Sequence, residues 1–322
     1  MAHEKALIQV DSLSKVYDAI TAVDSISFTI YTGEIFGLLG PNGAGKTTAI
    51  SILAGILSQT GGKVTMNGKP FQNSPEERSQ IGFVPQDLAI YNKLTGRENL
   101  HFFGSLYGLQ SRKLTDKTRD MLELVGLSEH ADRRTETYSG GMKRRLNLAS
   151  GLMHEPKLLL LDEPTVGVDP QSRNHIFEGV RALNKEGLTV LYTSHYMEEV
   201  QTLCHRVGIM DRGRLIAYDS VEALISLHGT ASVLLTLGVS FLSADILEEI
   251  ESEETVRGKV QIESGNELNQ CRIVVSADRP DRAIPPLVNL LNSHHTPLLS
   301  LEIKQPTLED VFLSLTGKHL RD

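Results

Sequence analysis

The sequence predicts an α/β fold: a domain built on a parallel sheet and interrupted by a helical insert, followed by a smaller α+β domain. Three observations predict it. The glycine-rich stretch GPNGAGKTT separates an apolar run from a helical pattern. The apolar runs KLLLLDEP and LTVLYTSH flank a helical pattern, as parallel strands do. After residue 226, short strand and helix patterns begin again. We therefore expect one domain over 1–225, with a helical subdomain at about 97–153, and a second over 226–322.

The N-terminal part of the first domain is predicted to be β-rich. LIQV, SISFTI and EIFGLLG are short apolar or β-branched runs separated by turn residues. The pair Asn67-Gly68 predicts a hairpin turn. Directly after the glycine-rich stretch, helical spacing predicts one apolar helix face. Its members are Ile50, Leu53, Ile56 and Leu57.

The remaining elements follow in chain order. Helices are expected from ENLHFFGSLYGL, TDKTRDMLELVGL and MKRRLNLASGLM in the insert, and then from QSRNHIFEGVRALNKEG, which a glycine ends. VGIMDRGRLIAYDS predicts a closing hairpin. In the second domain the strand patterns are ASVLLTL, KVQIES, CRIVVSA and LLSLEIKQ, and the helix patterns are ADILEEIES, AIPPLVNLLNS and TLEDVFLSLTG. We find no cluster of chemical groups in that domain and expect it to serve packing and interaction.

The composition of the chain argues against several classes of function. Its 322 residues carry a formal net charge of −8, which disfavours a general nucleic-acid binder but leaves room for a local nucleotide site. No apolar run approaches the roughly 18 residues of a membrane span, and the charged N-terminus is unlike a signal peptide. Cys204 and Cys271 are isolated in the sequence, which fits a reduced cytosolic setting.

The stretch GPNGAGKTT matches the phosphate-binding loop G-x-x-x-x-G-K-[ST], in the strand-to-helix context that this motif requires. Its glycines let backbone N–H groups surround the α- and β-phosphates. Lys46 then reaches the β- and γ-phosphates, and the Thr47 hydroxyl suits Mg²⁺. The motif alone does not separate kinases, GTPases, helicases and transport ATPases. The residues that we expect to contact the nucleotide are Gly40, Pro41, Asn42, Gly43, Ala44, Gly45, Lys46, Thr47 and Thr48.

Two carboxylates end the apolar run LLLLDEP. At the carboxyl edge of a parallel sheet, Asp162 and Glu163 would face the phosphate-binding loop. Asp162 suits Mg²⁺, directly or through water, and Glu163 suits a general base that polarises an attacking water. The alternative is a plain acidic strand end at a turn, which the loop upstream makes the weaker interpretation.

A second phosphate-binding element is predicted at YSGGMKRRL. Ser139 is a favourable N-cap, and Gly140 and Gly141 open the backbone at the start of a helix, where anions bind. Taken alone, this segment is better interpreted as an ordinary serine-capped helix.

The order and spacing of these motifs resemble the ATP-binding-cassette (ABC) ATPases over roughly residues 5–225. The series is GPNGAGKTT, FVPQD, SGG, LLLLDEP, GVDP and TSH. The resemblance implies ATP and Mg²⁺ as cofactors. It implies that Tyr17 stacks on adenine, that Asp169 communicates across a dimer, and that the catalytic residues are Glu163, His195 and Gln86. His195 would contact the γ-phosphate. The implied metal ligands are Thr47, Gln86 and Asp162.

Family ATPases close head to tail as dimers. The resemblance therefore implies that Ser139, Gly140 and Gly141 complete the ATP site of a second subunit, either another copy of this chain or a paralogue. Closure with ATP and reopening after hydrolysis then drive a conformational change in a partner. Two departures from the family pattern affect this contact: Tyr138 stands in place of leucine, and Met142 stands in place of glutamine and lacks its amide.

The segment PTLEDVFLSLTG resembles the end of ATPases that serve ABC-2 type exporters, including antibiotic and multidrug efflux pumps. This implies a peripheral ATPase at the cytoplasmic face of the membrane. Its partner would be a separately encoded ABC-2 type permease that exports a drug, lipid-like compound or polysaccharide, and no nucleic acid is expected as a partner. KLTGRENLHFF resembles the stretch preceding the groove that receives the permease's coupling helix.

Two alternatives stay open beside the exporter subunit. One is a cassette ATPase acting on ribosomes or DNA, which the acidic chain and the single cassette disfavour. The other is a nucleotide-binding regulatory module without turnover, which Glu163 and His195 disfavour.

Overall fold

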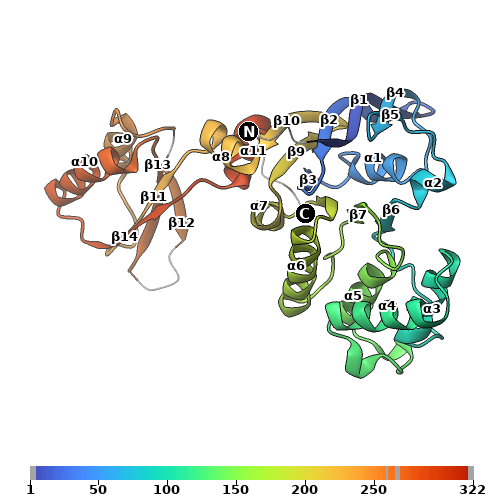
Figure 1. The fold of residues 1–322 in the computed structure, drawn as a ribbon. Coiled ribbons are helices and arrows are strands. Elements are labelled where there is room, and N and C mark those ends of the chain that lie inside the picture. The colour runs from blue at the N-terminus through green and yellow to red at the C-terminus, as the bar shows by residue number, and fades with distance from the viewer. Residues whose placement is uncertain (1–4, 259, 265–268, 318–322) are drawn as a thin grey trace. The chain divides into compact units, whose positions relative to one another are not determined.

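The structure is a computed structural model that describes residues 5–258, 260–264 and 269–317 (Figure 1). The chain divides into two units, one that runs to Val221 and one that begins at Glu222. The boundary expected from the sequence, between residues 225 and 226, falls inside helix α8 (Val221–His228). No helix of the described ranges is long and apolar enough to cross a membrane.

A six-stranded sheet forms the centre of the first unit, in the order β10-β9-β3-β8-β7-β6. All neighbouring strands are parallel except β10, which returns antiparallel to β9 as the predicted hairpin. The side chains of β7 and β8 are buried along their whole length, because helices cover both faces of such a sheet. The strands are β3 (Ile35–Leu39), β6 (Ile81–Val84), β7 (Leu158–Asp162), β8 (Thr189–Ser194), β9 (Arg206–Asp211) and β10 (Arg214–Ser220).

A second, antiparallel sheet confirms the predicted β-rich N-terminal part. Its strand order is β2-β1-β4-β5, and Phe28 of β2 stacks on Phe36 of the central sheet with ring centroids 5.3 Å apart. Asn67 and Gly68 form the hairpin turn with φ values of 53° and 75°, as an Asn-Gly turn requires. The strands are β1 (Ala6–Tyr17), β2 (Ile20–Tyr31), β4 (Gly61–Met66) and β5 (Lys69–Pro70).

The helices of the first unit fall into two groups (Figure 1). One group accompanies the central sheet: α1 (Lys46–Leu53), α2 (Pro75–Arg78), α6 (Pro170–Lys185) and α7 (Met197–Leu203). The other is the predicted helical insert: α3 (Gly96–Leu106), α4 (Ser111–Leu124) and α5 (Gly140–Ser150), with 3₁₀ turns at Ser128–His130 and Thr135–Thr137. A capping box between Thr95 and Glu98 begins α3.

The expected apolar helix face extends too far, because Ile56 and Leu57 lie beyond the helix, although Leu57 is partly buried and packs against the core. Helix α1 ends at Leu53, and Gly55 with φ of 71° turns the chain away from the helix axis. Ile56 lies beyond that turn with 60% of its side chain exposed, whereas Ile50 and Leu53 are buried. Apolar spacing continued past the glycine that ends the helix, and for this reason the pattern overestimated its length.

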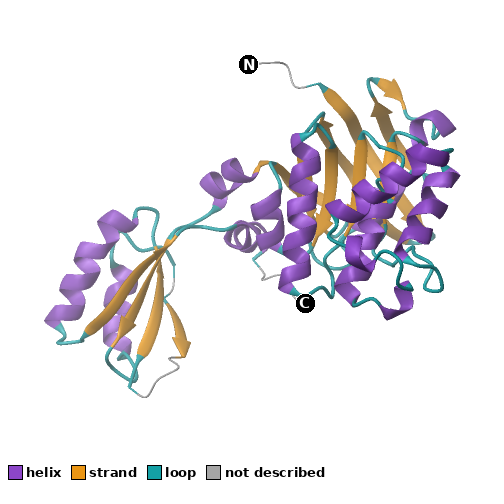
Figure 2. Ribbon diagram, turned by 60° about the horizontal axis from the view of Figure 1, so that its bottom comes forward, coloured by secondary structure: helices purple, strands orange, loops and turns teal. Residues whose placement is uncertain are grey.

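The second unit is a four-stranded antiparallel sheet in the order β12-β13-β11-β14, with α9 and α10 on one face (Figure 2). Its core joins Val233 and Leu235 of β11, Ile273 of β13, and Ile250 and Leu287 of the two helices. The elements follow the predicted order: β11 (Ser232–Leu237), α9 (Ala244–Ser252), β12 (Gln261–Ser264), β13 (Cys271–Ser276), α10 (Pro280–Ser293), β14 (Leu298–Lys304) and α11 (Leu308–Thr316).

Candidate nucleotide-binding and catalytic site

The predicted phosphate-binding loop connects the carboxyl end of β3 to the start of α1. Gly43 and Gly45 have φ values of 79° and 101°, which L side chains rarely adopt. At Gly40 a Cβ would meet the main-chain oxygen of Met210 at 2.3 Å, so only glycine allows this approach. The sequence thus bends the backbone into a tight cradle at a helix N-terminus, the geometry that binds phosphate.

Lys46 is the first residue of α1, and its side chain is almost fully buried. Its Nζ donates hydrogen bonds to the main-chain oxygens of Gly40 at 2.7 Å and Pro41 at 3.1 Å. The same Nζ lies 3.1 Å from Glu163 Oε1. The ammonium therefore lies above the loop and beside the Glu163 carboxylate. A bound phosphate would compete with that carboxylate for the ammonium.

Asp162 ends β7 and faces the loop across the carboxyl edge of the sheet, as predicted. Its Oδ1 accepts hydrogen bonds from the Thr193 hydroxyl at 2.7 Å and from the Thr47 hydroxyl at 3.3 Å. Burial raises the pKa of the Asp162 carboxyl, and these two hydrogen bonds oppose that rise. The site thereby brings a carboxylate and a hydroxyl together, the oxygen ligands that Mg²⁺ prefers.

Glu163 is buried beside Asp162 and contacts two other predicted site residues. One carboxylate oxygen pairs with Lys46, and the other lies 3.0 Å from His195 Nδ1. The backbone of Glu163 has φ of 45°, a strained value for a residue with a side chain. Its N–H donates to the Thr193 hydroxyl at 3.0 Å, which helps to hold that conformation.

Gln86 follows β6 and is exposed. The main-chain oxygen of Gln86 accepts a hydrogen bond from Arg144 Nη1. Arg144 Nη2 also donates to the Val166 oxygen at 3.4 Å, so this arginine of α5 joins Gln86 to the segment after Glu163. No local sequence pattern marks Arg144, because its partners come from two segments distant in the chain.

Tyr17 lies at the end of β1, with 42% of the residue exposed. Lys15 Nζ stands 4.9 Å from the centre of its ring. The adjoining strand β2 touches the phosphate-binding loop, since a Cβ at Gly45 would meet the Ala22 oxygen at 2.3 Å. An exposed aromatic ring on the hairpin next to the loop is available for stacking.

The segment Ser139–Gly141 forms the N-terminus of α5. The Ser139 hydroxyl accepts a hydrogen bond from the Met142 N–H at 3.2 Å and so caps the helix. A Cβ at Gly140 would have open space, whereas a Cβ at Gly141 would meet Ser172 Oγ at 2.1 Å and Asp169 Oδ2 at 3.0 Å. Figure 1 places α5 in the helical insert, apart from α1 and its loop.

The two departures noted in this segment have different structural settings. Tyr138 is buried, and its hydroxyl donates to the His130 oxygen at 2.6 Å under the start of α3. Tyr138 therefore joins parts of the insert, a contact that leucine would lack. Met142 is partly buried within the first turn of α5. Asp169 caps α6 by accepting from the Ser172 N–H at 2.9 Å, which lowers the pKa of its carboxyl.

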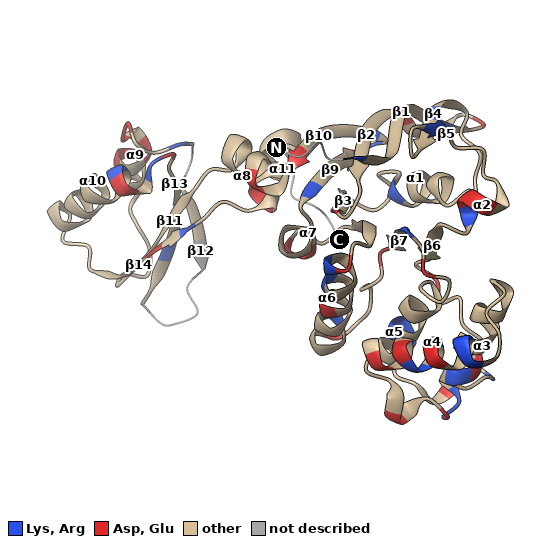
Figure 3. Ribbon diagram, in the orientation of Figure 1, with Lys and Arg blue, Asp and Glu red and all other residues tan. Residues whose placement is uncertain are grey.

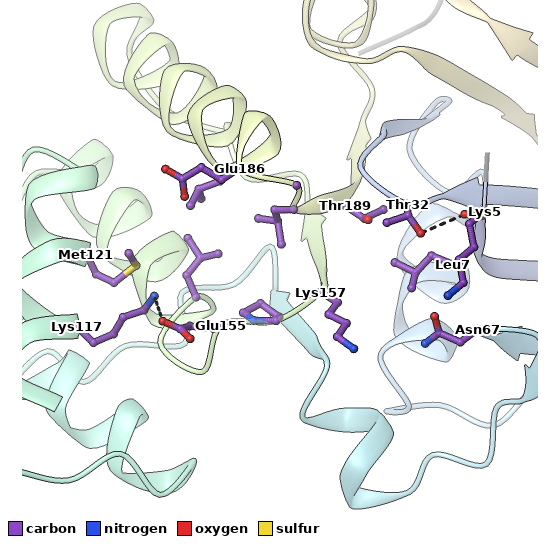
Figure 4. A pocket seen from close by; sticks show the side chains of 15 residues that line it. Lys5, Leu7, Thr32, Asn67, Lys117, Met121, Glu155, Lys157, Glu186 and Thr189 are labelled. Atoms are coloured by element: carbon purple, nitrogen blue, oxygen red, sulfur yellow. Dashed lines mark hydrogen bonds and ion pairs between the residues drawn. The ribbon is translucent and has the colours of Figure 1, made fainter. Parts of the chain in front are cut away.

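A cavity of about 570 Å³ lies elsewhere in the first unit (Figure 4). Lys157 and Thr189, which line it, stand at the amino ends of β7 and β8. The predicted site residues Asp162, Glu163 and His195 stand at the carboxyl ends of the same strands, where ligands bind in open α/β sheets. The cavity is therefore separate from the candidate site.

A phosphate-binding loop, a strand-end Asp-Glu pair and a neighbouring histidine define a P-loop ATPase. The chain matches the family model described as "ABC transporter" over residues 23–166. It is 44% identical to the linearmycin resistance ATP-binding protein LnrL of Bacillus subtilis (strain 168), over 98% of this chain and 100% of that protein. It is 36% identical to the daunorubicin resistance ATP-binding protein DrrA2 of Streptomyces coeruleorubidus, over 96% and 95%.

A solved structure agrees with these relatives. CbiO1 of Clostridium perfringens, part of the ABC transporter complex CbiONQ, superposes with a TM-score of 0.64 at 28% identity. The superposition covers 70% of this chain and 92% of that one. The chain belongs to the ABC transporter family, as an ATP-binding subunit that hydrolyses ATP to power transport through a separate permease.

Proposed function

We propose that this chain binds MgATP through its phosphate-binding loop and hydrolyses it with Glu163 and His195, to power export by an ABC-2 type permease. The observation that carries the proposal is the continuous contact from Lys46 through Glu163 to His195 at the carboxyl edge of the sheet. Cation, carboxylate and imidazole are thereby gathered where a γ-phosphate would lie above the loop.

The residues present fit a magnesium ion. Thr47 and Asp162 offer a hydroxyl and a carboxylate within hydrogen-bond distance of each other, and Gln86 would add an amide oxygen. A bound Mg²⁺ would supply charge neutralisation for the β- and γ-phosphates. Lys46 would hold the same phosphates as a fixed cation.

Glu163 serves in this proposal as the general base. Its two oxygens engage Lys46 and His195, so the carboxylate is oriented before an attacking water arrives. His195 holds Glu163 through Nδ1, which leaves its other ring nitrogen for the γ-phosphate. Tyr17 would stack on adenine at the exposed hairpin, and the loop residues Gly40–Thr48 would bind the phosphates.

A second ATPase subunit completes the site in this proposal. Ser139, Gly140 and Gly141 offer a capped helix N-terminus, yet α5 lies apart from the loop of its own chain (Figure 1). In a head-to-tail dimer this helix would contact the partner's ATP, and Asp169 at the neighbouring helix cap would transmit the contact. The second subunit is another copy of this chain or a paralogue.

The first unit of this chain has a groove that is suitable for docking a permease. A cavity of about 280 Å³ lies between the end of α1, the segment after Gln86 and the insert, with Phe103, Tyr107 and His154 in its lining. Two of its lining residues, Ile56 and Tyr107, are exposed, and the exposed rings of Tyr91 and Phe102 contact Phe103. An apolar rim of this kind fits a short amphipathic helix from a membrane protein, and it would hold the ATPase at the cytoplasmic face.

The relatives' names support an exported cargo of the drug or antibiotic class, since LnrL and DrrA2 are named as linearmycin and daunorubicin resistance proteins. A role on ribosomes or DNA is the second candidate. Acidic and basic residues are interspersed on α3 and α4 (Figure 3), and the chain carries a formal net charge of −8, which disfavours nucleic acid. In this proposal residues 1–225 are the nucleotide-binding domain and 226–322 an accessory domain.

Replacing the base tests the enzymatic part of the proposal. Glu163→Gln is expected to keep ATP binding, abolish turnover and accumulate as an ATP-bound dimer in size-exclusion chromatography. The matched control is Glu178→Gln at an exposed position of α6, which should hydrolyse ATP like the unchanged protein. Undiminished hydrolysis by Glu163→Gln would remove Glu163 from the proposed role.

Purification from membranes tests the transport part. Affinity-tagged protein is expected to co-purify with a membrane protein of about six spans. Recovery with ribosomes and without such a protein would favour the second candidate instead.

A further inference from the structure

The buried carboxylate of Glu199 contacts the two segments that carry the catalytic residues, and the proposed chemistry does not use it. Glu199 belongs to α7 and is 2% exposed. Its Oε2 accepts three hydrogen bonds: from the Thr165 hydroxyl at 2.8 Å, from the Tyr192 hydroxyl at 2.8 Å, and from the Ser194 hydroxyl at 2.9 Å. The three donors are buried as well.

The donors belong to the two segments that carry the catalytic side chains. Thr165 lies two residues after Glu163, and Ser194 directly precedes His195. The Ser194 hydroxyl also accepts from the Tyr196 N–H at 2.9 Å, so the chain is held on both sides of His195. The Glu199 carboxylate thereby joins the segment that follows Glu163 to the end of β8, next to His195.

The energetics of this cluster point beyond simple packing. A buried carboxylate is costly unless hydrogen bonds compensate it, and an apolar side chain would fill the same volume without that cost. The other oxygen of Glu199 is buried and accepts no hydrogen bond from the described residues, and Arg173 Nη1 lies 3.8 Å from it. What the charge does provide is a fixed orientation for three hydroxyl groups, because charge-assisted hydrogen bonds are short and directional.

The segment that the cluster holds needs such support. Glu163 has a strained φ of 45°, and its contact with His195 at 3.0 Å joins residues far apart in the chain. Strained residues keep their conformation only where the surroundings over-determine it. A small shift of either segment would separate the base from the histidine.

We infer that Glu199 is a positioning residue for ATP hydrolysis, which sets the placement of Glu163 relative to His195 through the hydroxyls of Thr165, Tyr192 and Ser194. The inference rests on the proposed roles of Glu163 and His195. Glu199 touches neither nucleotide nor water in this role. It acts on turnover and leaves nucleotide binding to the loop, where Lys46 and Thr47 lie.

The kinetic constants of two Glu199 variants test the inference. Glu199→Ala is expected to lower kcat by about 100-fold, the effect of a misplacement near 1 Å, and to leave KM for ATP within about twofold. Glu199→Gln keeps one oxygen acceptor and should restore part of the loss. The matched control is Glu198→Gln, its exposed neighbour on α7, which should retain the kcat of the unchanged protein.

Two conservative variants cover the case in which Glu199→Ala does not fold. Thr165→Val and Tyr192→Phe each remove one donor and keep the shape of the side chain. Each is expected to lower kcat by about three- to tenfold at unchanged KM. Melting temperature and equilibrium ATP binding, measured on the same samples, show whether the proteins are folded and bind nucleotide.

The outcomes separate this inference from the function on which it rests. If Glu163→Gln stops turnover but the Glu199, Thr165 and Tyr192 variants keep the kcat of Glu198→Gln, the positioning role is wrong and the proposed function stands. The same holds if folded variants lose ATP affinity with kcat unchanged. If Glu163→Gln itself hydrolyses ATP normally, the proposed function fails first.

Discussion

The two units bury different kinds of side chain. In the first, Lys46, Asp162, Glu163 and Glu199 are all buried, and each has a charged or hydrogen-bonding partner. In the described part of the second, the buried polar side chains are the two threonines, Thr236 and Thr296, beside an apolar core. Buried charge costs stability, so its concentration in one unit marks where the molecule does chemistry.

Charges of the second unit lie at its surface. Arg257 pairs with Asp278 at 2.6 Å and Arg279 with Asp281 at 2.8 Å, and all four side chains are more than half exposed. Exposed pairs of this kind contribute little to stability, because water screens the two charges. The second unit therefore depends on apolar burial for its stability, whereas the first keeps a costly charged site within its core.

The largest expected effect concerns the apolar core of the second unit. Leu235→Ala in the central strand β11 removes a fully buried side chain and should cost about 2–5 kcal/mol in the stability of that unit. Hydrogen exchange of peptides from residues 232–304 measures this loss. ATP hydrolysis should be retained, because the proposed catalytic residues lie in the first unit.

Leu299→Ala is the control for this prediction, since Leu299 is exposed on β14 of the same unit. It should change protection by less than about 0.5 kcal/mol. Equal protection in both variants would show that the second unit does not depend on its apolar core, and would break the comparison.

The next effect concerns the buried cation of the first unit. Lys46→Ala removes the ammonium over the loop and should weaken ATP binding about 100-fold, as loss of charged hydrogen bonds to phosphate does. Equilibrium titration with a fluorescent ATP analogue measures it. Lys63→Ala, at an exposed position of β4, should bind like the unchanged protein. Equal affinity of the two variants would contradict the assignment of the loop.

A smaller effect is expected within the helical insert. Tyr138→Phe removes the hydrogen bond to the His130 oxygen and should lower the free energy of unfolding by about 1 kcal/mol. Thermal denaturation measures it. Tyr91→Phe changes a half-exposed ring and should leave stability unaltered. If both variants are equally stable, Tyr138 fills space in the insert and its hydroxyl contributes nothing.

The smallest expected effect is an increase in stability, and it depends on pH. Burial raises the pKa of the Asp162 carboxyl above its unfolded value, so the folded state holds that proton more tightly. The stability from this proton is present below the unfolded pKa and is lost as pH rises through the folded pKa. Asp162→Asn should therefore slightly raise the melting temperature of nucleotide-free protein at pH 7.

Melting curves between pH 4 and pH 7 check this prediction. The gain from Asp162→Asn should shrink toward pH 4, where the carboxyl of the unchanged protein is increasingly protonated in the folded state. A gain that stays constant over the range would show that the effect does not come from ionisation of Asp162.

Local patterns predicted much of the fold and of the candidate site. Three features depend on only a few neighbouring residues each, so their geometry follows from local rules. They are the loop GPNGAGKTT, the strand end at Asp162 and the hairpin at Asn67-Gly68. The exposed Ile56 shows the limit of such rules, because the glycine that ends α1 stands inside the apolar spacing.

Contacts between distant segments could not be predicted in this way. Thr193, which bonds both Asp162 and the Glu163 main chain, lies in a buried strand whose pattern shows only that it is buried. Glu199 looks like one acidic residue in the first turn of a helix. Two of its donors, Tyr192 and Ser194, lie on the preceding strand β8, but the third, Thr165, lies 34 residues away in the chain. Arg144 likewise acquires its partners only when α5 meets the segments after β6 and β7.

At Gly141, α5 meets the first turn of α6 so closely that not even a methyl group fits between them. Close-packed helices transmit displacement because there is no space to absorb it. A push on the Ser139 end of α5 therefore reaches Asp169, and through the adjoining chain the strained backbone at Glu163. In the proposed head-to-tail dimer, α5 of one subunit would contact its partner's ATP while Glu163 of the same subunit acts on its own ATP. Displacement at one site would then reach the other, so each subunit would respond to the occupancy of both sites.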